Sequence, residues 1–97
     1  MKKKPLDGIR VIELSTFLAV PTCGRILGML GADVIKIEPV EGEFFRIEAP
    51  IFDAGIPCTN EENPIYLNAN AGKRMIAIDL KASEGMHIFH KLIKSAD

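Results

Sequence analysis

The sequence predicts an α/β fold, a partial doubly wound (Rossmann-like) parallel sheet with helices packed on it. Three observations support this prediction. Segments rich in β-branched and aliphatic residues recur at positions 9–14, 33–37 and 75–80. Helical periodicity follows the first and third of these segments. A strand, a helix and a strand in so short a stretch form a βαβ unit, which requires parallel strands and a right-handed crossover.

The first strand, residues 9–14, follows Gly8 and is expected to be buried. Pro21 suits the first turn of the next helix, because its missing N–H is not needed there. Gly31 is expected to end that helix in a left-handed conformation. The apolar stripe that should face the sheet consists of Ile26, Leu27, Met29 and Leu30.

The second strand, residues 33–37, ends at Glu38 and Pro39, and a long stretch with little periodicity follows at residues 40–72. Loops of this length are uncommon in compact proteins and are usually functional or disordered. This stretch is too apolar for simple disorder, so we expect it to pack against the rest of the protein. Its large apolar side chains are Phe44, Phe45, Ile51, Phe52 and Tyr66.

The third strand is predicted at residues 75–80, and Ser83 is the expected N-cap of a last helix with Glu84 in its first turn. One face of that helix is apolar (Met86, Phe89, Leu92, Ile93, Ala96) and the other is polar (His87, His90, Lys91, Lys94). Three strands and two helices leave an edge and faces of such a sheet uncovered. The sequence is therefore expected to be a fragment of something larger.

Composition excludes several classes of protein. With 47% hydrophobic and 26% charged residues, the 97-residue chain has the balance of a globular domain. A net charge of −1 gives no reason to expect nucleic acid or an anionic membrane as a partner. The lysines at 2–4 precede no apolar stretch of signal-peptide or membrane-spanning length. Cys23 and Cys58 are best interpreted as free thiols of a reducing cytosol, so a cytoplasmic location is expected.

A βαβ unit with an acid at the end of its second strand invites comparison with dinucleotide-binding domains. In those domains the turn after the first strand is rich in glycine, which lets the backbone approach a pyrophosphate. Here that turn, residues 15–21, contains no glycine. An NAD- or FAD-binding module is therefore the weakest of the functional alternatives.

Two groups of residues could contact an anionic ligand. Phe17, Leu18 and Ala19 lie at the carboxyl end of the first strand, before a helix N-terminus, where they either meet a ligand or only pack the corner. The cations are Arg46, Lys73, Arg74 and Lys81, which suit a phosphate-rich ligand but are more often a solvated surface.

Other chemical groups do not form a recognisable site. His87 and His90 are three residues apart on a helix, but no further ligand completes a metal site, so we expect none. Cys23, inside a predicted helix, is expected to be a small buried hydrophobe. No spacing singles out a catalytic pair among Glu13, Glu38, Glu41 and Glu43.

The residues themselves resemble a known family. Residues 5–14, 19–21 and 30–38 strongly resemble the opening of CaiB/BaiF (family III) coenzyme A transferases. Residues 42–46 match the family's G-[DE]-x-x-R step, and residues 70–81 with Glu84 and Gly85 match its N-x-x-K-R-x-I-x-L-D-L-K-x-x-E-G block. These segments occur in the family's order across nearly the whole chain, which makes the resemblance specific. The segment 61–66 looks most like the branch that handles 2-hydroxyacyl groups.

The resemblance implies an enzyme that moves CoA from an acyl-CoA to a free carboxylic acid, with an aspartate nucleophile and covalent anhydride and thioester intermediates. It implies that residues 1–97 are the N-terminal part of the large domain. The nucleophile would lie beyond residue 97, so no aspartate here, Asp79 included, is assigned that role. The substrate would be a CoA thioester, with no tightly bound cofactor. The full-length protein would form an interlocked homodimer, and the isolated fragment should be inactive and weakly stable.

The resemblance also implies a partial CoA site. Leu18 and Ala19 match positions that touch CoA, and residues 78–81 match the stretch beside its adenine and phosphates. The predicted CoA-binding residues are thus Leu18, Ala19, Ile78, Asp79, Leu80 and Lys81, with Lys81 the best cation, and the possible additional contacts are Phe17, Arg46 and Arg74. One departure is Pro39, because several relatives carry an arginine there.

An α-methylacyl-CoA racemase or related isomerase is the main alternative, because it shares this N-terminal half. The downstream sequence would separate it from a transferase. A preference for NAD over CoA in titrations would favour the nucleotide-binding module instead.

Overall fold

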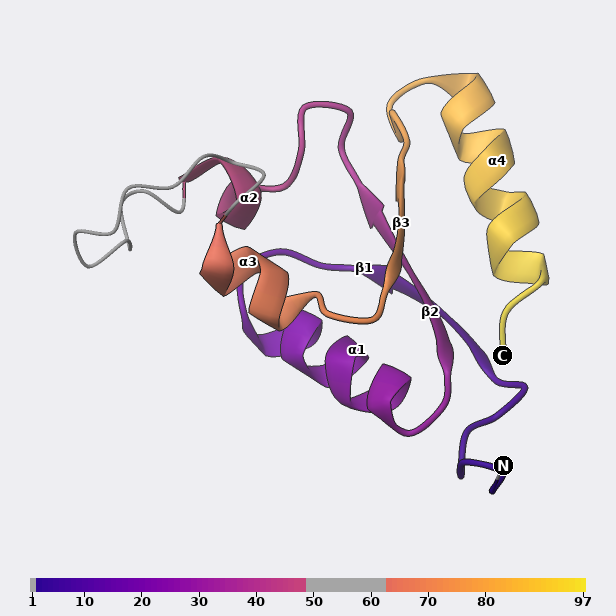
Figure 1. Ribbon diagram of the computed structural model, residues 1–97. Helices are drawn as coiled ribbons and strands as arrows, with labels where there is room; N and C mark the ends of the chain where they lie inside the picture. Colours follow the sequence, from indigo (N-terminus) through magenta and orange to yellow (C-terminus); the bar gives the residue numbers. More distant parts are fainter. Residues whose placement is uncertain (1, 49–62) are drawn as a thin grey trace.

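The computed structural model of the protein describes residues 2–48 and 63–97 (Figure 1). Along the chain these residues form seven elements: β1 (Arg10–Leu14), α1 (Ala19–Met29), β2 (Asp33–Glu38), α2 (Phe44–Glu48), α3 (Pro64–Ala69), β3 (Arg74–Ala77) and α4 (Ser83–Lys94). None of these helices is long and apolar enough to span a membrane.

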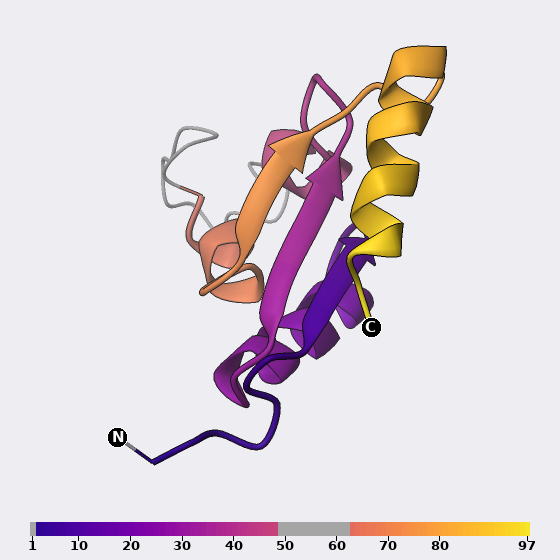
Figure 2. The same ribbon diagram turned by 90° about the vertical axis from the view of Figure 1, so that its right-hand side faces the viewer.

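The strands form a parallel sheet in the order β1-β2-β3, which confirms the predicted α/β class (Figure 2). In β1 and β2, Arg10 pairs with Asp33 and Leu14 with Ile37, so both strands end at the same edge. Gly31 has a φ of 108° and ends the helical segment before β2, as expected. The described sheet thus aligns three strand ends at one edge.

The helices cover both faces of the sheet. α1 and α3 lie on one face and α4 lies on the other (Figure 1). Successive side chains of a strand point to opposite faces, so β2 directs Val34, Lys36 and Glu38 toward α1 and α3, and Ile35 and Ile37 toward α4. All five of these side chains are buried.

The stretch predicted to lack regular structure contains two short helices, which corrects that prediction. α3 begins where the Asn63 side chain accepts hydrogen bonds from the backbone N–H groups of Ile65 and Tyr66, and Pro64 is its first residue. Phe45 and Tyr66 are 2% exposed, so the expected packing of this stretch is confirmed there. Ile51 and Phe52 lie outside the described residues.

Several finer predictions differ from the structure. β1 is only partly buried because no strand covers its outer edge in the described sheet. β3 ends at Ala77 rather than at residue 80. The N-cap of α4 is Ala82 instead of Ser83, and no side chain caps that helix. Cys23 is exposed on α1, so it is not the buried hydrophobe that was expected, and Cys58 lies outside the described residues.

A buried polar network joins the sheet to α3 and, through the Pro21 carbonyl that accepts from Lys73 at 2.7 Å, to α1. Lys36 donates to Glu43 Oε1 at 3.2 Å and to Asn70 Oδ1 at 2.9 Å. The Lys73 ammonium donates to Glu13 Oε2 at 3.0 Å and to the same Asn70 oxygen at 3.0 Å. Both ammonium groups are buried, so these acceptors are needed to offset their loss of hydration.

Candidate functional site

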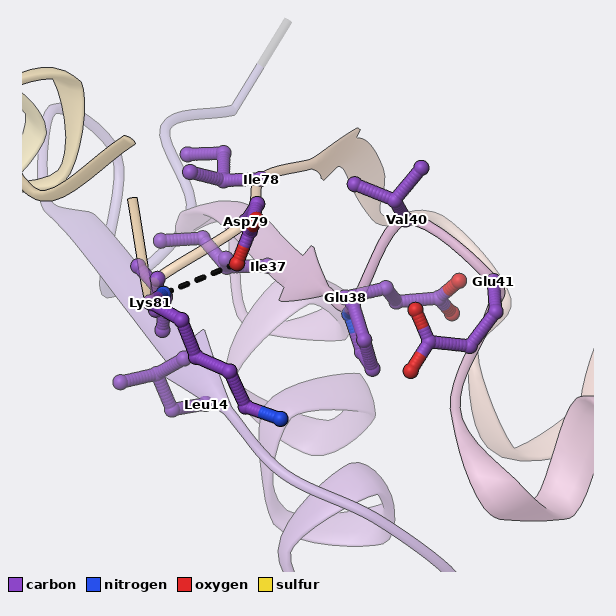
Figure 3. Close-up of a pocket in the computed structure, with 10 residues that line it drawn as sticks. Leu14, Ile37, Glu38, Val40, Glu41, Ile78, Asp79 and Lys81 are labelled. Atoms are coloured by element: carbon purple, nitrogen blue, oxygen red, sulfur yellow. Dashed lines mark hydrogen bonds between the residues drawn. The ribbon is translucent and has the colours of Figure 1, made fainter. Parts of the chain in front are cut away.

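A cavity of about 340 Å³ opens at the carboxyl ends of the strands (Figure 3). Leu14 of β1 and Ile37 of β2 line it, together with Val40 in the turn after β2 and residues 78–81 after β3. Ligands of open α/β sheets bind at this edge. Four of the six residues that the sequence assigned to CoA thus line one cavity.

The cavity combines an apolar part with a few polar groups. Leu14, Ile37 and Ile78 supply apolar surface. Glu38, Glu41, Asp79 and Lys81 supply charge. Mostly apolar walls with a small number of oriented polar groups are typical of small-molecule sites.

Lys81 is the cation of this cavity. Its backbone N–H donates to Asp79 Oδ1 at 2.9 Å, which closes the turn after β3 (Figure 3). Its side chain extends between Leu14 and Glu38 (Figure 3). Within the described parts of the chain, the ammonium has no ion-pair partner. It is therefore available to an anionic ligand.

The other predicted cations are already paired with carboxylates. Arg74 donates to Asp33 at 2.6 and 2.9 Å, at the opposite end of the strands from the cavity. Hydrogen bonding from Arg74, supported by Arg10, lowers the pKa of Asp33 below its ordinary value. The Lys73 side chain is buried against Glu13, so the interpretation of Lys73 as part of a solvated surface is wrong. The structure does not bring Arg74 and Lys73 to the cavity with Lys81.

Arg46 lies beside the cavity but is held by Glu38. Its guanidinium donates to both Glu38 oxygens, at 3.0 and 3.2 Å, and stacks 4.1 Å from the centroid of the Tyr66 ring. The Tyr66 hydroxyl also donates to Glu38 Oε1. Burial raises the pKa of Tyr66, and the hydrogen bond to Glu38 raises it further, so the hydroxyl stays protonated.

The contacts of Glu38 with Arg46 and Tyr66 are relevant to the alternative function, an NAD- or FAD-binding module. In dinucleotide-binding domains, the acid at the end of the second strand accepts hydrogen bonds from a ribose. Here both oxygens of Glu38 are occupied by Arg46 and Tyr66. The geometry therefore disfavours that use of Glu38, in agreement with the missing glycines.

The turn between β1 and α1 holds the other candidate residues. Leu18 and Ala19 are exposed and do not line the cavity. Phe17 has a left-handed backbone with φ of 65°, and its ring lies 5.0 Å from that of Phe45. The structure thus places the six predicted CoA-binding residues in two groups, Leu18 and Ala19 in the turn before α1 and residues 78–81 in the cavity after β3.

Sequence reasoning missed the residues that support these groups. Tyr66 was recognised only as an apolar loop residue, and Glu43 as one carboxylate among several. Gly85 belongs to the family motif, and the structure explains why a glycine is needed there. A Cβ at this position would collide with the carbonyl oxygen of Asp79. Pro39, which stands where several relatives carry an arginine, also lines the cavity.

Within the described ranges, the two histidines and Cys23 do not come together in a second site. His87 and His90 are exposed on α4. Among residues 2–48 and 63–97, no group of three His, Cys, Asp or Glu side chains could hold a metal ion.

Comparison with known proteins identifies the family. The family model described as CoA-transferase family III matches residues 6–97. The chain therefore belongs to CoA-transferase family III. A solved CAIB/BAIF family protein from Brucella suis matches with a TM-score of 0.82 and 39% identity, over 99% of this chain and 25% of that one.

Two characterised relatives are similar to this chain at nearly equal identity. One is the (R)-2-hydroxy-4-methylpentanoate CoA-transferase of Clostridioides difficile, 44% identical over 92 residues, which are 95% of this chain and 23% of the relative. The other is the succinate–glutarate CoA-transferase of Agrobacterium fabrum, 43% identical over 97 residues, which are 99% of this chain and 24% of the relative. The chain spans about a quarter of the length of these relatives.

Proposed function

We propose that this chain supplies part of the CoA-binding site of an enzyme that transfers CoA between an acyl-CoA and a free carboxylic acid. In this proposal residues 1–97 are the N-terminal part of the large domain of a full-length protein. The observation that carries the proposal is the cavity at the strand ends, which Lys81 lines together with the apolar side chains of Leu14 and Ile78. The Lys81 ammonium has no ion-pair partner among residues 2–48 and 63–97. CoA offers an adenine ring for the apolar surface and phosphates for the cation.

The chemistry itself is assigned to residues outside this chain. We propose that an aspartate carboxylate from another part of the full-length protein attacks the thioester and displaces the CoA thiolate, which leaves a mixed anhydride. The thiolate then attacks the enzyme carbonyl of that anhydride, so that the acyl group leaves as a free carboxylate and CoA is held as an enzyme thioester. The incoming acid reverses these two steps. The residues described here bind and orient CoA throughout.

We further propose that the acid is a 2-hydroxy acid. The Clostridioides difficile relative, named for such a substrate, is 44% identical to this chain. The resemblance of residues 61–66 to the 2-hydroxyacyl branch supports the same choice.

An exchange experiment on the full-length protein tests these proposals. The protein is incubated with one 2-hydroxyacyl-CoA and a different free 2-hydroxy acid, and mass spectrometry follows the two thioesters. We expect the thioester of the second 2-hydroxy acid to form. When succinate replaces that acid as the acceptor, we expect succinyl-CoA to form more slowly. A faster reaction with succinate would contradict the 2-hydroxy acid assignment alone. Inversion at the α carbon without any exchange would contradict the transfer itself and favour an isomerase.

A further inference from the structure

Three donors converge on the carboxylate of Glu43, which is 1% exposed. Its Oε1 accepts from the Lys36 ammonium at 3.2 Å. Its Oε2 accepts from the backbone N–H of Phe45 at 2.8 Å and from the backbone N–H of Phe17 at 3.4 Å. The carboxylate therefore links the middle of β2 to the turn that precedes α1.

The Phe17 end of this link is conformationally demanding. Phe17 is the one non-glycine residue with positive φ in the described part of the chain. A left-handed backbone is uncommon for a bulky side chain, so it persists only where its surroundings hold it. Here the Phe17 ring contacts those of Phe44 and Phe45, and its N–H points to Glu43.

Only an ionised carboxylate satisfies all three donors at once. A glutamine in its place would offer one acceptor oxygen and an NH₂ group that is itself a donor. That NH₂ would face either the Lys36 ammonium or the two backbone N–H groups. One side of the link must then be lost, whichever way the amide is turned.

The turn held in this way leads directly into Leu18 and Ala19, two positions at which the family resemblance implies contact with CoA. We propose that Glu43 is a positioning residue, which holds the turn before α1 through the Phe17 N–H so that Leu18 and Ala19 meet CoA. Glu43 touches neither substrate. This inference rests on the proposed function and adds to it a residue that acts at a distance from the ligand.

The test compares two variants of the full-length protein, E43Q and V34A. Val34 is buried near the start of β2 on the same face as Lys36, close to Gly28 of α1, so V34A lowers stability without touching the turn. Calorimetry gives the Kd for CoA, and thermal unfolding gives the stability of each variant. We expect E43Q to raise the Kd about tenfold, and V34A to change it less than about twofold at a comparable loss of thermal stability.

A second pair of variants distinguishes positioning from a general effect of the buried charge. Glycine adopts positive φ without strain, so F17G removes the steric cost of this backbone conformation, and it also removes the Phe17 ring contacts. The Glu43 link then no longer holds a strained, packed turn in place. We expect E43Q to raise the Kd less than about threefold when it is introduced into F17G. The full tenfold effect in that background, or equal effects of E43Q and V34A in the native background, would overturn the inference. Absence of CoA binding by the unmodified protein would instead refute the proposed function.

Discussion

Two lysines lie in the interior of this small fold, and each one is held by a carboxylate. Lys36 contacts Glu43, and Lys73 contacts Glu13, while Asn70 accepts from both ammonium groups. Burial lowers the pKa of Lys73, and the Glu13 carboxylate opposes that effect. A buried ion pair of this kind adds little net stability. Removing one partner, however, leaves a buried charge without compensation and destabilises the fold.

Replacing Lys73 by methionine tests this at the residue scale. K73M leaves Glu13 buried without its cation, so we expect a loss of about 3–5 kcal/mol in the free energy of unfolding. Denaturant unfolding of the full-length protein measures the loss. Adding E13Q removes the stranded charge and should restore part of the stability. A double variant that is no more stable than K73M would show that charge burial is not the cause.

The exposed pairs at the other end of the strands predict a dependence on pH. Arg74 and then Arg10 lower the pKa of Asp33 in the folded state, so the folded protein favours the ionised form more than the unfolded chain does. This contribution is present above the unfolded pKa and disappears as the pH falls through the folded pKa. We expect D33N to be less stable than the unmodified protein at pH 7, and the difference to shrink as the solution is acidified. A difference that grows on acidification would contradict the assignment.

At the scale of elements, α4 is fixed close to the turn that carries Lys81. Gly85, near the start of α4, lies against the carbonyl oxygen of Asp79 and the side chain of Ile78. Any larger residue would push the helix away from this turn. The position of Lys81 therefore depends on a glycine in the neighbouring helix.

The variant G85A tests that dependence, and G28A is its matched control. Both glycines lie in helices, but a Cβ at Gly28 would make only an ordinary 3.7 Å contact with Val34. Alanine favours a helix by about 1 kcal/mol over glycine, so G28A should maintain or raise the midpoint of thermal unfolding. We expect G85A to lower that midpoint and to weaken CoA binding. Equal behaviour of the two variants would contradict the steric argument.

The elements also show what the sequence could predict. The first strand, helix and second strand were predicted within a few residues, because aliphatic runs and the glycine at 31 are local signals. α2 and α3 were missed because helices of five and six residues are too short to show periodicity. The Asn63-Pro64 start of α3 was a usable signal that was not recognised.

At the scale of the whole molecule, the sheet determines which candidate residues meet. Parallel strands with aligned ends bring residues 78–81 to Leu14 and Ile37. The pairing of Lys73 with Glu13, 60 residues away, depends on tertiary packing. Spacing along the chain could not reveal this pairing. It also could not show that carboxylates hold Arg46 and Arg74, whereas no carboxylate among the described residues pairs with Lys81.

The affinity of the full-length protein for CoA, measured by calorimetry on the unmodified protein and on K81A and K91A, tests whether the cavity at the strand ends receives CoA. Lys91 is exposed on α4 and does not line the cavity, so it controls for the loss of one positive charge. Because Lys81 is proposed to pair with a phosphate of CoA, we predict that K81A weakens binding about tenfold, or about 1.4 kcal/mol. K91A should leave the affinity unchanged. An unchanged affinity in K81A would contradict the claim that this cavity receives CoA.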